Sequence, residues 1–264
     1  MKTIAFLGGG RITGALLAGL RLAKYKGPLI VHDHHLEKLR KLRKEYAAEV
    51  EPDLQRAIQQ ADILIIAVRP SSVGQLLDGV GELDRPRIAV SLAAGIPLSK
   101  LRAGLGPEVR WVRAMPSPAC RSRRGLTALT FDRRFPATGK REIKTFFSHV
   151  GPVLEISEAK FDAFTVTYSS SHGYHALAAL AEAGQRVGLD RKTALIAASH
   201  ALADGIISWR EGNISLEGLL HEAATPGGIA AAVMEASDRA GYRKSVQRGL
   251  TAGLARARKN SASF

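Results

Sequence analysis

The sequence predicts an α/β protein in which a Rossmann-type, doubly wound parallel sheet is followed by an all-α domain. Short apolar runs alternate with helical segments as far as about residue 118, the pattern of parallel strands joined by helices. A glycine-rich turn separates the first run from the first helix. From about residue 159, long alanine-rich helical patterns replace this alternation. We therefore expect a dinucleotide-binding domain over residues 1–158 and a helical domain over residues 159–264.

The bulk composition is that of an ordinary globular protein. The chain has 264 residues, of which 45% are hydrophobic and 23% charged. No apolar run approaches the roughly twenty residues that span a bilayer, and we see no secretory leader. The single cysteine, Cys120, excludes an internal disulfide framework. We expect a cytoplasmic protein.

The net charge of +14 raises the question of a nucleic-acid partner. The basic residues are scattered along the chain, however, and aromatic residues make up only 6% and do not interleave with them. No stacking platform for bases is visible. A solvated basic surface that attracts anionic ligands is the favoured interpretation, and nucleic-acid binding is disfavoured.

The first turn has the features of a dinucleotide-binding site. Thr3–Leu7 reads as a buried strand, Gly8, Gly9 and Gly10 follow, and apolar residues return at helical spacing from Ile12. Such glycines let the backbone approach a pyrophosphate, whose charge is stabilised by the helix N-terminus. A third glycine would fall at Thr13, so we expect a compact variant of the turn. The residues expected to contact the cofactor here are Gly8, Gly10, Arg11, Ile12 and Thr13.

The end of the second predicted strand, Pro28–Val31, carries the next candidates. Asp33 lies about twenty residues beyond the glycines, where an acidic side chain usually binds ribose hydroxyls. Its basic neighbour His34 is suited instead to a 2′-phosphate, so both residues are cofactor candidates. A metal site is not expected, because no fourth ligand accompanies the histidines. A polar loop without a ligand remains the alternative.

Three further strands complete the predicted parallel sheet. They are expected over Ile63–Val68, Arg87–Leu92 and Val109–Met115. Ligands of such sheets bind at the carboxyl ends of the strands, so the turns after all five strands should converge on one crevice.

The second half is predicted to be helical. Helices are expected over 174–187, 191–209 and 216–223, and over 229–258 with breaks. Asp190 is the expected N-cap of the second helix, and Gly188 ends the first.

Several motifs together resemble the pyrroline-5-carboxylate reductase family. They are Gly8-x-Gly10, Ala67-Val-Arg-Pro70, Ser91-Leu-Ala-Ala-Gly-Ile96, Arg113-Ala-Met-Pro116, Ala183-Gly-x-x-x-Gly-Leu189 and Thr225-Pro-Gly-Gly228. The resemblance implies reduction of a small cyclic imine, pyrroline-5-carboxylate, to proline in proline biosynthesis. It also implies NADPH as cofactor, with NADH as the alternative, and a homodimer formed by the helical domain. The further cofactor-contacting residues that it implies are Ala67, Val68, Arg69, Pro70, Ala93, Ala94, Met115 and Pro116.

Two segments are expected to hold the substrate. In Tyr168–Tyr174, hydroxyl groups before a helix form a cradle for a carboxylate, with Ser170 and Ser171 as candidates. His172 stands near a family proline and is our candidate proton donor, with helix capping as the alternative role. The second segment supplies Thr225, Gly227 and Gly228.

Both substrate segments depart from the family pattern. The first usually reads S-G-S-G-P-A, and in the second a hydroxyl usually follows the two glycines, where this chain has Ile229 and Ala230. A divergent imine reductase, or an NADP-binding protein without turnover such as a redox sensor, is therefore the alternative function. Hydroxyacid dehydrogenases of the 6-phosphogluconate type are disfavoured, because they use a lysine and none lies between Lys160 and Lys192.

Overall fold

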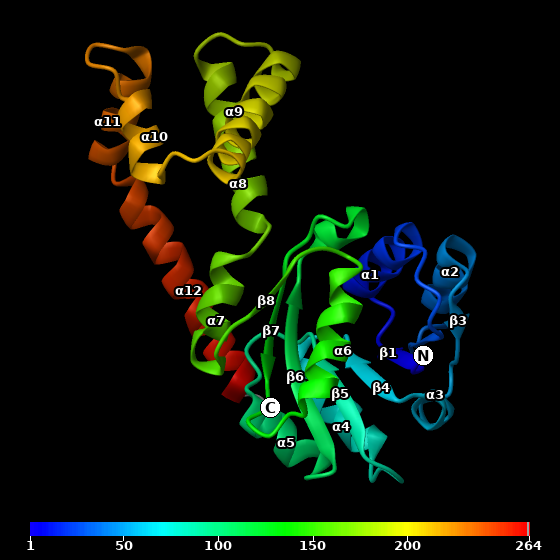
Figure 1. The fold of residues 1–264 in the computed structure, drawn as a ribbon. Helices are drawn as coiled ribbons and strands as arrows, with labels where there is room; N and C mark the ends of the chain where they lie inside the picture. The colour runs from blue at the N-terminus through cyan, green and yellow to red at the C-terminus, as the bar shows by residue number, and fades with distance from the viewer. Residues whose placement is uncertain (263) are drawn as a thin grey trace. The chain divides into compact units, whose positions relative to one another are not determined.

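The computed structural model describes residues 1–262 and 264, and it contains the predicted doubly wound sheet (Figure 1). Eight strands lie in the order β3-β2-β1-β4-β5-β6-β7-β8. All neighbours are parallel except β6 and β7, which are antiparallel. The strands are β1 (Ile4–Leu7), β2 (Leu29–His32), β3 (Glu49–Val50), β4 (Ile63–Ile66), β5 (Arg87–Ser91), β6 (Val109–Pro116), β7 (Thr127–Phe131) and β8 (Val153–Glu155).

Helices cover both faces of the sheet, and each face has its own apolar core. One core joins the sheet to α1 (Arg11–Leu22), α2 (Leu36–Tyr46) and α6 (Ala137–Ser148). The other joins it to α3 (Leu54–Gln60), α4 (Val73–Val80) and α5 (Leu98–Leu105). All residues of β1 and β4 are buried, which explains why these strands read as continuous apolar runs.

The segment after Pro116 contains elements that the sequence pattern did not predict. A 3-10 turn, η2 (Pro118–Ser122), precedes β7, α6 and β8, and α7 (Glu158–Thr167) follows. β7 carries threonine at its first and fourth positions, and β3 and β8 are only two and three residues long. Such strands give a weak apolar signal because neighbouring strands, rather than their own side chains, fix their place. β4 ends at Ile66 rather than Val68, and the 3-10 turn η1 (Pro70–Ser72) precedes α4.

The chain divides into two compact units, which are described separately here. The first consists of Met1–Tyr168 with Ala252–Phe264, and the second, the helical unit, of Ser169–Thr251. The sequence placed the domain boundary between residues 158 and 159, whereas the compact units keep α7 in the first unit. The last turns of α12 (Tyr242–Ala262) also belong there, since Asn260 Nδ2 donates to the carbonyl oxygen of Ala94 at 3.3 Å.

The helical unit contains α8 (Ser171–Arg186), α9 (Arg191–Glu211), α10 (Leu216–Ala223), α11 (Ile229–Arg239) and the first turns of α12. Asp190 caps α9 as predicted, accepting from the backbone N–H groups of Lys192 and Thr193. Gly188 has a φ of +113°, which suits a residue that ends a helix. The break in the last predicted helix falls at Ala240 and Gly241. α8 begins at Ser171, three residues earlier than predicted.

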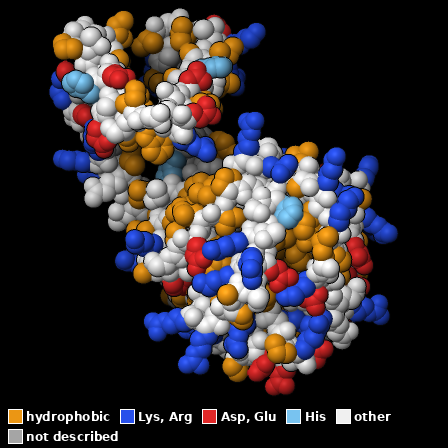
Figure 2. Space-filling view, in the orientation of Figure 1, with side chains coloured by type: hydrophobic (Ala, Val, Ile, Leu, Met, Phe, Trp, Pro, Cys, Tyr) orange, Lys and Arg blue, Asp and Glu red, His pale blue; other side chains and the backbone are white. Residues whose placement is uncertain are grey.

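The helical unit leaves many large apolar side chains uncovered. Among the residues that the structure describes, twenty large hydrophobic residues are exposed, and sixteen of them belong to this unit. Hydrophobic side chains are visible on its surface (Figure 2). α9 alone exposes Leu195, Ile196, Ile206, Ile207 and Trp209. Exposed apolar side chains in such number within one unit suggest surface that a partner would bury. No helix among the described residues is long and apolar enough to cross a membrane.

Candidate functional site

The turn between β1 and α1 is fixed by Gly8 and Thr13. Gly8 has a φ of +119°, and a Cβ atom there would lie 2.7 Å from the carbonyl oxygen of Ala67. This glycine is therefore required by the fold. The Thr13 hydroxyl is buried and donates to the carbonyl oxygen of Gly8 at 2.6 Å. This bond explains how threonine can replace the usual third glycine, because its buried hydroxyl stabilises the turn by bonding to the turn's own backbone.

Gly10 is different, because nothing in the protein requires a glycine there. Its φ of −79° and ψ of −173° are open to any residue, and the nearest atom to a Cβ would be the carbonyl oxygen of Ala67, at 4.0 Å. Gly10 is the N-cap of α1 and supplies no side-chain hydrogen bond to the helix. Free N–H groups beside open space suit an anionic group that approaches the backbone closely. We call this open space beside the N–H groups at the start of α1 the cradle. It has room for a pyrophosphate because Gly10 has no side chain to fill it.

Asp33, at the end of β2, is buried and makes its bonds within the protein. Its Oδ2 accepts from the backbone N–H of Gly9 at 2.9 Å, and its Oδ1 accepts from the backbone N–H of His35 at 2.9 Å. His35 Nδ1 lies 2.9 Å from Oδ1, and Lys38 Nζ lies 3.2 Å from Oδ2. Burial raises the pKa of this carboxyl group, but the hydrogen bonds from His35, Gly9 and Lys38 outweigh it and lower the pKa to about 2.

The histidines beside Asp33 point into solvent. The side chains of His34 and His35 are 82% and 56% exposed, and their ring centroids lie 3.9 Å apart. Donor atoms of Asp33, His34 and His35 lie within 4.8 Å of one another, but the carboxylate already binds Gly9 and Lys38. The absence of a metal site stays a prediction.

The other cofactor candidates of the first unit lie at the same edge of the sheet. β1, β4, β5 and β6 are adjacent and parallel, so Ala67, Ala93 and Met115 follow neighbouring carboxyl ends. The N–H of Ala67 donates to Leu7 at 2.8 Å, and that of Leu92 donates to Ile66 at 3.0 Å. Arg11 and Arg69 are exposed, whereas Ala93 and Pro116 are buried; Ile12, Val68, Pro70, Ala94 and Met115 are half-buried.

Arg113 is a buried charged residue that the sequence did not single out as a site residue. It lies on β6, is 1% exposed, and pairs with Glu158 at 3.0 Å and Asp162 at 2.5 Å. Its guanidinium carbon lies 4.4 Å from the centre of the Phe161 ring. Glu158 also accepts from the backbone N–H of Leu98 at 3.0 Å. Through these contacts Arg113 links α7 and the start of α5 to β6, the strand that ends at Met115 and Pro116. The sequence could have indicated this role, because a charged arginine inside an apolar strand needs a buried partner.

The first substrate segment lies at the start of α8, where Ser170 is half-buried and Ser171 and His172 are exposed. Ser170 is the N-cap, while Ser171 and His172 lie inside the first turn, which corrects the expectation that the whole segment precedes the helix. The hydroxyl groups of Ser169 and Ser171 lie 2.7 Å apart. The N–H of His172 donates to the carbonyl oxygen of Ser169 at 3.1 Å, so the turn is partly closed by its own backbone.

The second substrate segment ends at the N-terminus of α11. Gly227 has a φ of +74°, and Gly228 is the helix N-cap with its N–H donating to the carbonyl oxygen of Thr225 at 2.8 Å. Thr225 and Gly227 are exposed, and Gly228 is half-buried. Ile229 is 87% exposed and is one of the large apolar side chains that this unit leaves uncovered.

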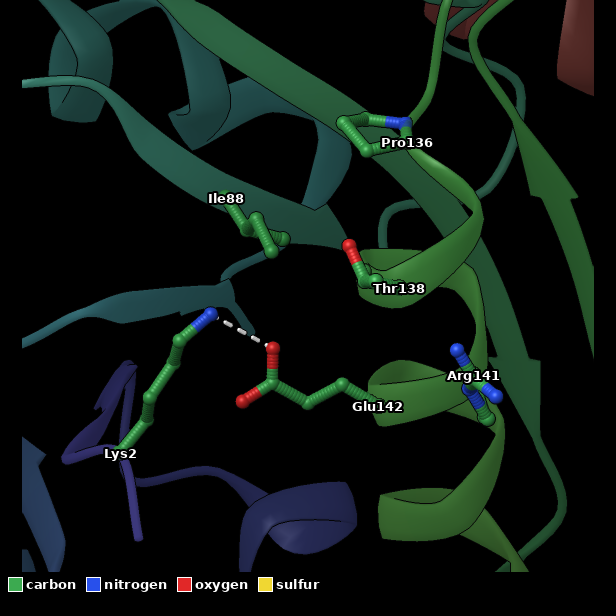
Figure 3. Close-up of a pocket in the computed structure, with 7 residues that line it drawn as sticks. Lys2, Ile88, Pro136, Thr138, Arg141 and Glu142 are labelled. Atoms are coloured by element: carbon green, nitrogen blue, oxygen red, sulfur yellow. Dashed lines mark hydrogen bonds and ion pairs between the residues drawn. The ribbon is translucent and has the colours of Figure 1, made fainter.

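Two other features of the first unit lie apart from these residues. Cys120 is fully buried, and burial raises the pKa of its thiol to about 11, so it is not a nucleophile. A surface hollow of about 460 Å³ is lined by Lys2, Ile88, Pro136, Thr138, Gly139, Arg141 and Glu142 (Figure 3). Lys2 precedes β1 and Ile88 lies near the amino end of β5, so this hollow is at the opposite edge of the sheet from the glycine turn. None of the predicted site residues lines it.

Comparison with protein families gives one match for each half of the chain. Residues 3–95 match the family described as NADP oxidoreductase, coenzyme F420-dependent. Residues 158–260 match the family described as pyrroline-5-carboxylate reductase dimerisation. The order of the two matches agrees with the predicted order of a nucleotide-binding half and a helical half.

Several relatives that resemble the chain over most of its length are named pyrroline-5-carboxylate reductase. A pyrroline-5-carboxylate reductase of Corynebacterium melassecola is 30% identical over 250 residues, which cover 92% of this chain and 93% of that protein. One from Mycobacterium leprae is 32% identical over 77% of this chain and 72% of that protein. Solved structures agree in fold: a pyrroline carboxylate reductase of Plasmodium falciparum with NADP bound has a TM-score of 0.88 at 19% identity, covering 98% of both chains. The glycine turn, the strand-end motifs and these full-length relatives together show that the chain belongs to the pyrroline-5-carboxylate reductase family.

Proposed function

We propose that this protein reduces pyrroline-5-carboxylate to proline with a nicotinamide cofactor, as an enzyme of proline biosynthesis. The observation that carries the proposal is the likeness to reductases of that name over 92% of the chain, through both halves. A redox enzyme of this kind needs a cofactor site and a substrate site, and each half of the chain has candidates for one of them. We place the enzyme in the cytoplasm, in keeping with its single, buried and unpaired cysteine.

The cofactor half of the proposal depends on the turn between β1 and α1. NADPH or NADH, when bound, supplies the hydride. The pyrophosphate is held by the N–H groups that begin α1, beside Gly10, and the carboxyl ends of β4, β5 and β6 surround the rest of the cofactor. The first unit carries 30 Lys and Arg residues against 16 Asp and Glu residues, while the helical unit has eight of each. The entire net charge of +14 therefore lies on the unit that binds the anionic cofactor, where it raises the rate of encounter.

The substrate half assigns roles to the two exposed segments of the helical unit. Ser170 and Ser171, at the N-terminus of α8, bind the carboxylate of the imine through hydroxyl and N–H groups. Thr225, Gly227 and Gly228 line the substrate at the start of α11. His172 supplies the proton that the imine nitrogen needs, because imidazole exchanges protons near neutral pH. An imine that is already protonated needs only positioning and exclusion of water, so no larger catalytic constellation is required.

The uncovered apolar surface of the helical unit supports a homodimer. Sixteen large hydrophobic residues are exposed on 83 residues of this unit, from Ser169 to Thr251, and the segment matches a family described by dimerisation. A second copy of the chain is the partner that would bury them.

The experiment follows absorbance at 340 nm with NADPH and NADH, with and without pyrroline-5-carboxylate. Substrate-dependent loss of absorbance is expected. The test variant is Gly10→Ala, whose Cβ would approach the carbonyl oxygen of Ala67 no closer than 4.0 Å but would occupy the cradle, so we expect little change in Tm and loss of cofactor binding by at least about tenfold. Wild-type protein that binds NADPH and leaves it unoxidised with this imine would rule out the proposed reaction.

One observation favours a second candidate, a reductase of a different imine or a cofactor-binding protein without turnover. Ile229 and Ala230 follow the two glycines, where the family usually has a hydroxyl, and Ile229 is 87% exposed. An apolar group at that position suits a less polar substrate. A panel of cyclic imines with and without a carboxylate distinguishes the two candidates: preference for the uncharged imines supports the second, and no oxidation with any imine supports a binding protein.

A further inference from the structure

The end of the chain is bonded to the turn that follows β5. Asn260 Nδ2, on the last turns of α12, donates to the carbonyl oxygen of Ala94 at 3.3 Å. Lys100 Nζ, on the first turn of α5, donates to the carbonyl oxygen of Ser261 at 2.5 Å. All four residues belong to the first unit, although more than 150 residues separate the partners of each bond. These two bonds tie the end of α12 to the segment between β5 and α5.

The segment that they hold contains a turn with two possible forms. Gly95 has a φ of +82°, the value of the third residue of a type II turn. Type I and type II turns differ mainly in the orientation of their central peptide, which here joins Ala94 to Gly95. Asn260 binds the carbonyl group of this same peptide. The bond therefore favours one of the two orientations.

The orientation of this peptide also fixes the direction of its N–H group. A trans peptide is planar, so the N–H of Gly95 points away from the carbonyl oxygen of Ala94 and from Asn260. Among the residues that the structure describes, none accepts a hydrogen bond from the N–H groups of Ala94 and Gly95. Gly95 is buried, and a buried N–H group without an acceptor costs free energy unless a ligand or water binds it. The turn thus offers donors to a ligand.

The position of β5 in the sheet indicates which part of the ligand these donors meet. A dinucleotide binds across the crevice of a doubly wound sheet, with its pyrophosphate at the first turn and its adenosine ribose at the end of β2. β4, β5 and β6 lie on the other side of β1 from β2. The nicotinamide half of the cofactor therefore belongs over the ends of these three strands, where the turn after β5 lies.

We propose that the end of α12 takes part in cofactor binding, with Asn260 as a positioning residue for the nicotinamide half. By holding the Ala94–Gly95 peptide in one orientation, Asn260 directs its N–H group towards the cofactor. Lys100 supports this arrangement, because it binds the residue next to Asn260 and places a positive charge at the C-terminus of α12. The inference rests on the proposed function for the class of cofactor, and it does not depend on which imine is reduced.

The test compares NADPH with 2′-phospho-ADP, which is NADPH without the nicotinamide and its ribose. Equilibrium binding of each is measured with the full-length protein and without any imine. Asn260→Leu keeps the size of the side chain and removes the donor. It should weaken NADPH binding by about fivefold, as for the loss of one hydrogen bond, and change 2′-phospho-ADP binding by less than about twofold. Arg258→Ala, at an exposed position in the same helix, is the control and should change neither affinity.

A second variant and the melting temperature separate positioning from folding. Asn260→Ser, whose side chain is too short to reach Ala94, should weaken NADPH binding selectively as well. Unchanged NADPH affinity in both variants, or an equal loss of both ligands, would overturn the inference, and an accompanying fall in Tm would assign Asn260 to folding alone.

The same measurements distinguish this inference from the proposed reaction. Wild-type protein that binds neither ligand would overturn the inference together with the proposed function. A selective loss of NADPH affinity in the variants, with a wild type that leaves NADPH unoxidised in the presence of pyrroline-5-carboxylate, would support the inference and reject the reaction.

Discussion

At the scale of single residues, Asp33 joins the nucleotide-binding turn to the fold through its ionised carboxylate. Its pKa in the folded protein is about 2, below the ordinary value of 3.8, so the ionised form stabilises the folded state. This stabilisation is fully present above about pH 4 and is lost as the pH falls towards 2. Its size follows from the pKa difference and is about 2 kcal/mol.

We therefore predict that Asp33→Asn lowers the free energy of unfolding by about 2 kcal/mol at pH 7 and by roughly half of that near pH 3. Urea unfolding of both proteins between pH 7 and pH 3 measures this difference. A difference that stays constant down to pH 3 would show that the carboxylate charge contributes nothing to the turn.

His172 gives the second prediction at this scale. If it donates the proton, His172→Gln should lower kcat by about 10²-fold and flatten the dependence of kcat on pH, while KM changes little. Steady-state rates between pH 5.5 and 8.5 test this, and Ser169→Ala, in the same turn, is the matched control. Unchanged turnover and an unchanged pH profile would assign His172 to helix packing alone.

At the scale of elements, α1 is the helix whose packing is most restricted. A Cβ at Gly19 would overlap the carbonyl oxygen of Cys120, whereas at Gly14 the nearest atom would be 3.7 Å away. Gly14 lies one residue after the position expected for a third glycine, but the close approach occurs about one and a half turns further on, at Gly19 against η2. The position of that turn was not predictable, because η2 follows a strand more than ninety residues later in the chain.

Two glycine-to-alanine substitutions in α1 should consequently change the stability of the protein in opposite directions. Gly19→Ala should destabilise the protein by about 1–3 kcal/mol through overlap with the backbone of η2. Gly14→Ala should be neutral or stabilising by up to about 1 kcal/mol, because alanine favours the helix and meets only ordinary contacts. Thermal unfolding of the pair decides the matter, and equal effects would mean that α1 shifts to relieve the overlap.

The elements that the sequence did predict share one property. β1, β4 and β5 are buried on both faces or nearly so, and their continuous apolar runs specify them. The helix α10 was also predicted with the observed bounds. β3, β7 and β8 depend on neighbours distant in sequence. The cofactor edge was predictable because parallel strands bring their ends together, while the inward turn of Asp33 depended on Gly9 and Lys38 and required coordinates.

At the scale of the whole molecule, the two units contrast in charge and in exposed apolar surface. The first unit carries the net charge of +14, and the helical unit, which is neutral, exposes most of the apolar side chains. Lysine and arginine side chains cover much of the visible face of the first unit (Figure 2). Charge repels a second copy from one unit, and apolar surface favours it on the other.

Charged substitutions should therefore affect assembly in one unit only. If α9 forms part of the interface of the proposed homodimer, Ile206→Glu/Ile207→Glu should convert that dimer to a monomer, because each charge would have to be buried in the interface. Leu22→Glu, at a residue 61% exposed in the first unit, is the control and should leave the dimer intact. Light scattering after size-exclusion chromatography measures both masses, and a double variant that remains dimeric would place the interface elsewhere.

The packing of the last turns of α12 on the first unit has a consequence for biosynthesis. Gly95, in the turn after β5, has a φ of +82°, and a Cβ there would lie 2.5 Å from the carbonyl oxygen of Ala257. Residues 252–264 thus complete a unit whose other residues end at Tyr168. Domains generally fold in the order in which the ribosome releases them. Here the first unit, although most of it is translated first, is complete only once residues 252–264 have emerged from the ribosome, so a nascent chain that lacks these residues should have little cofactor affinity.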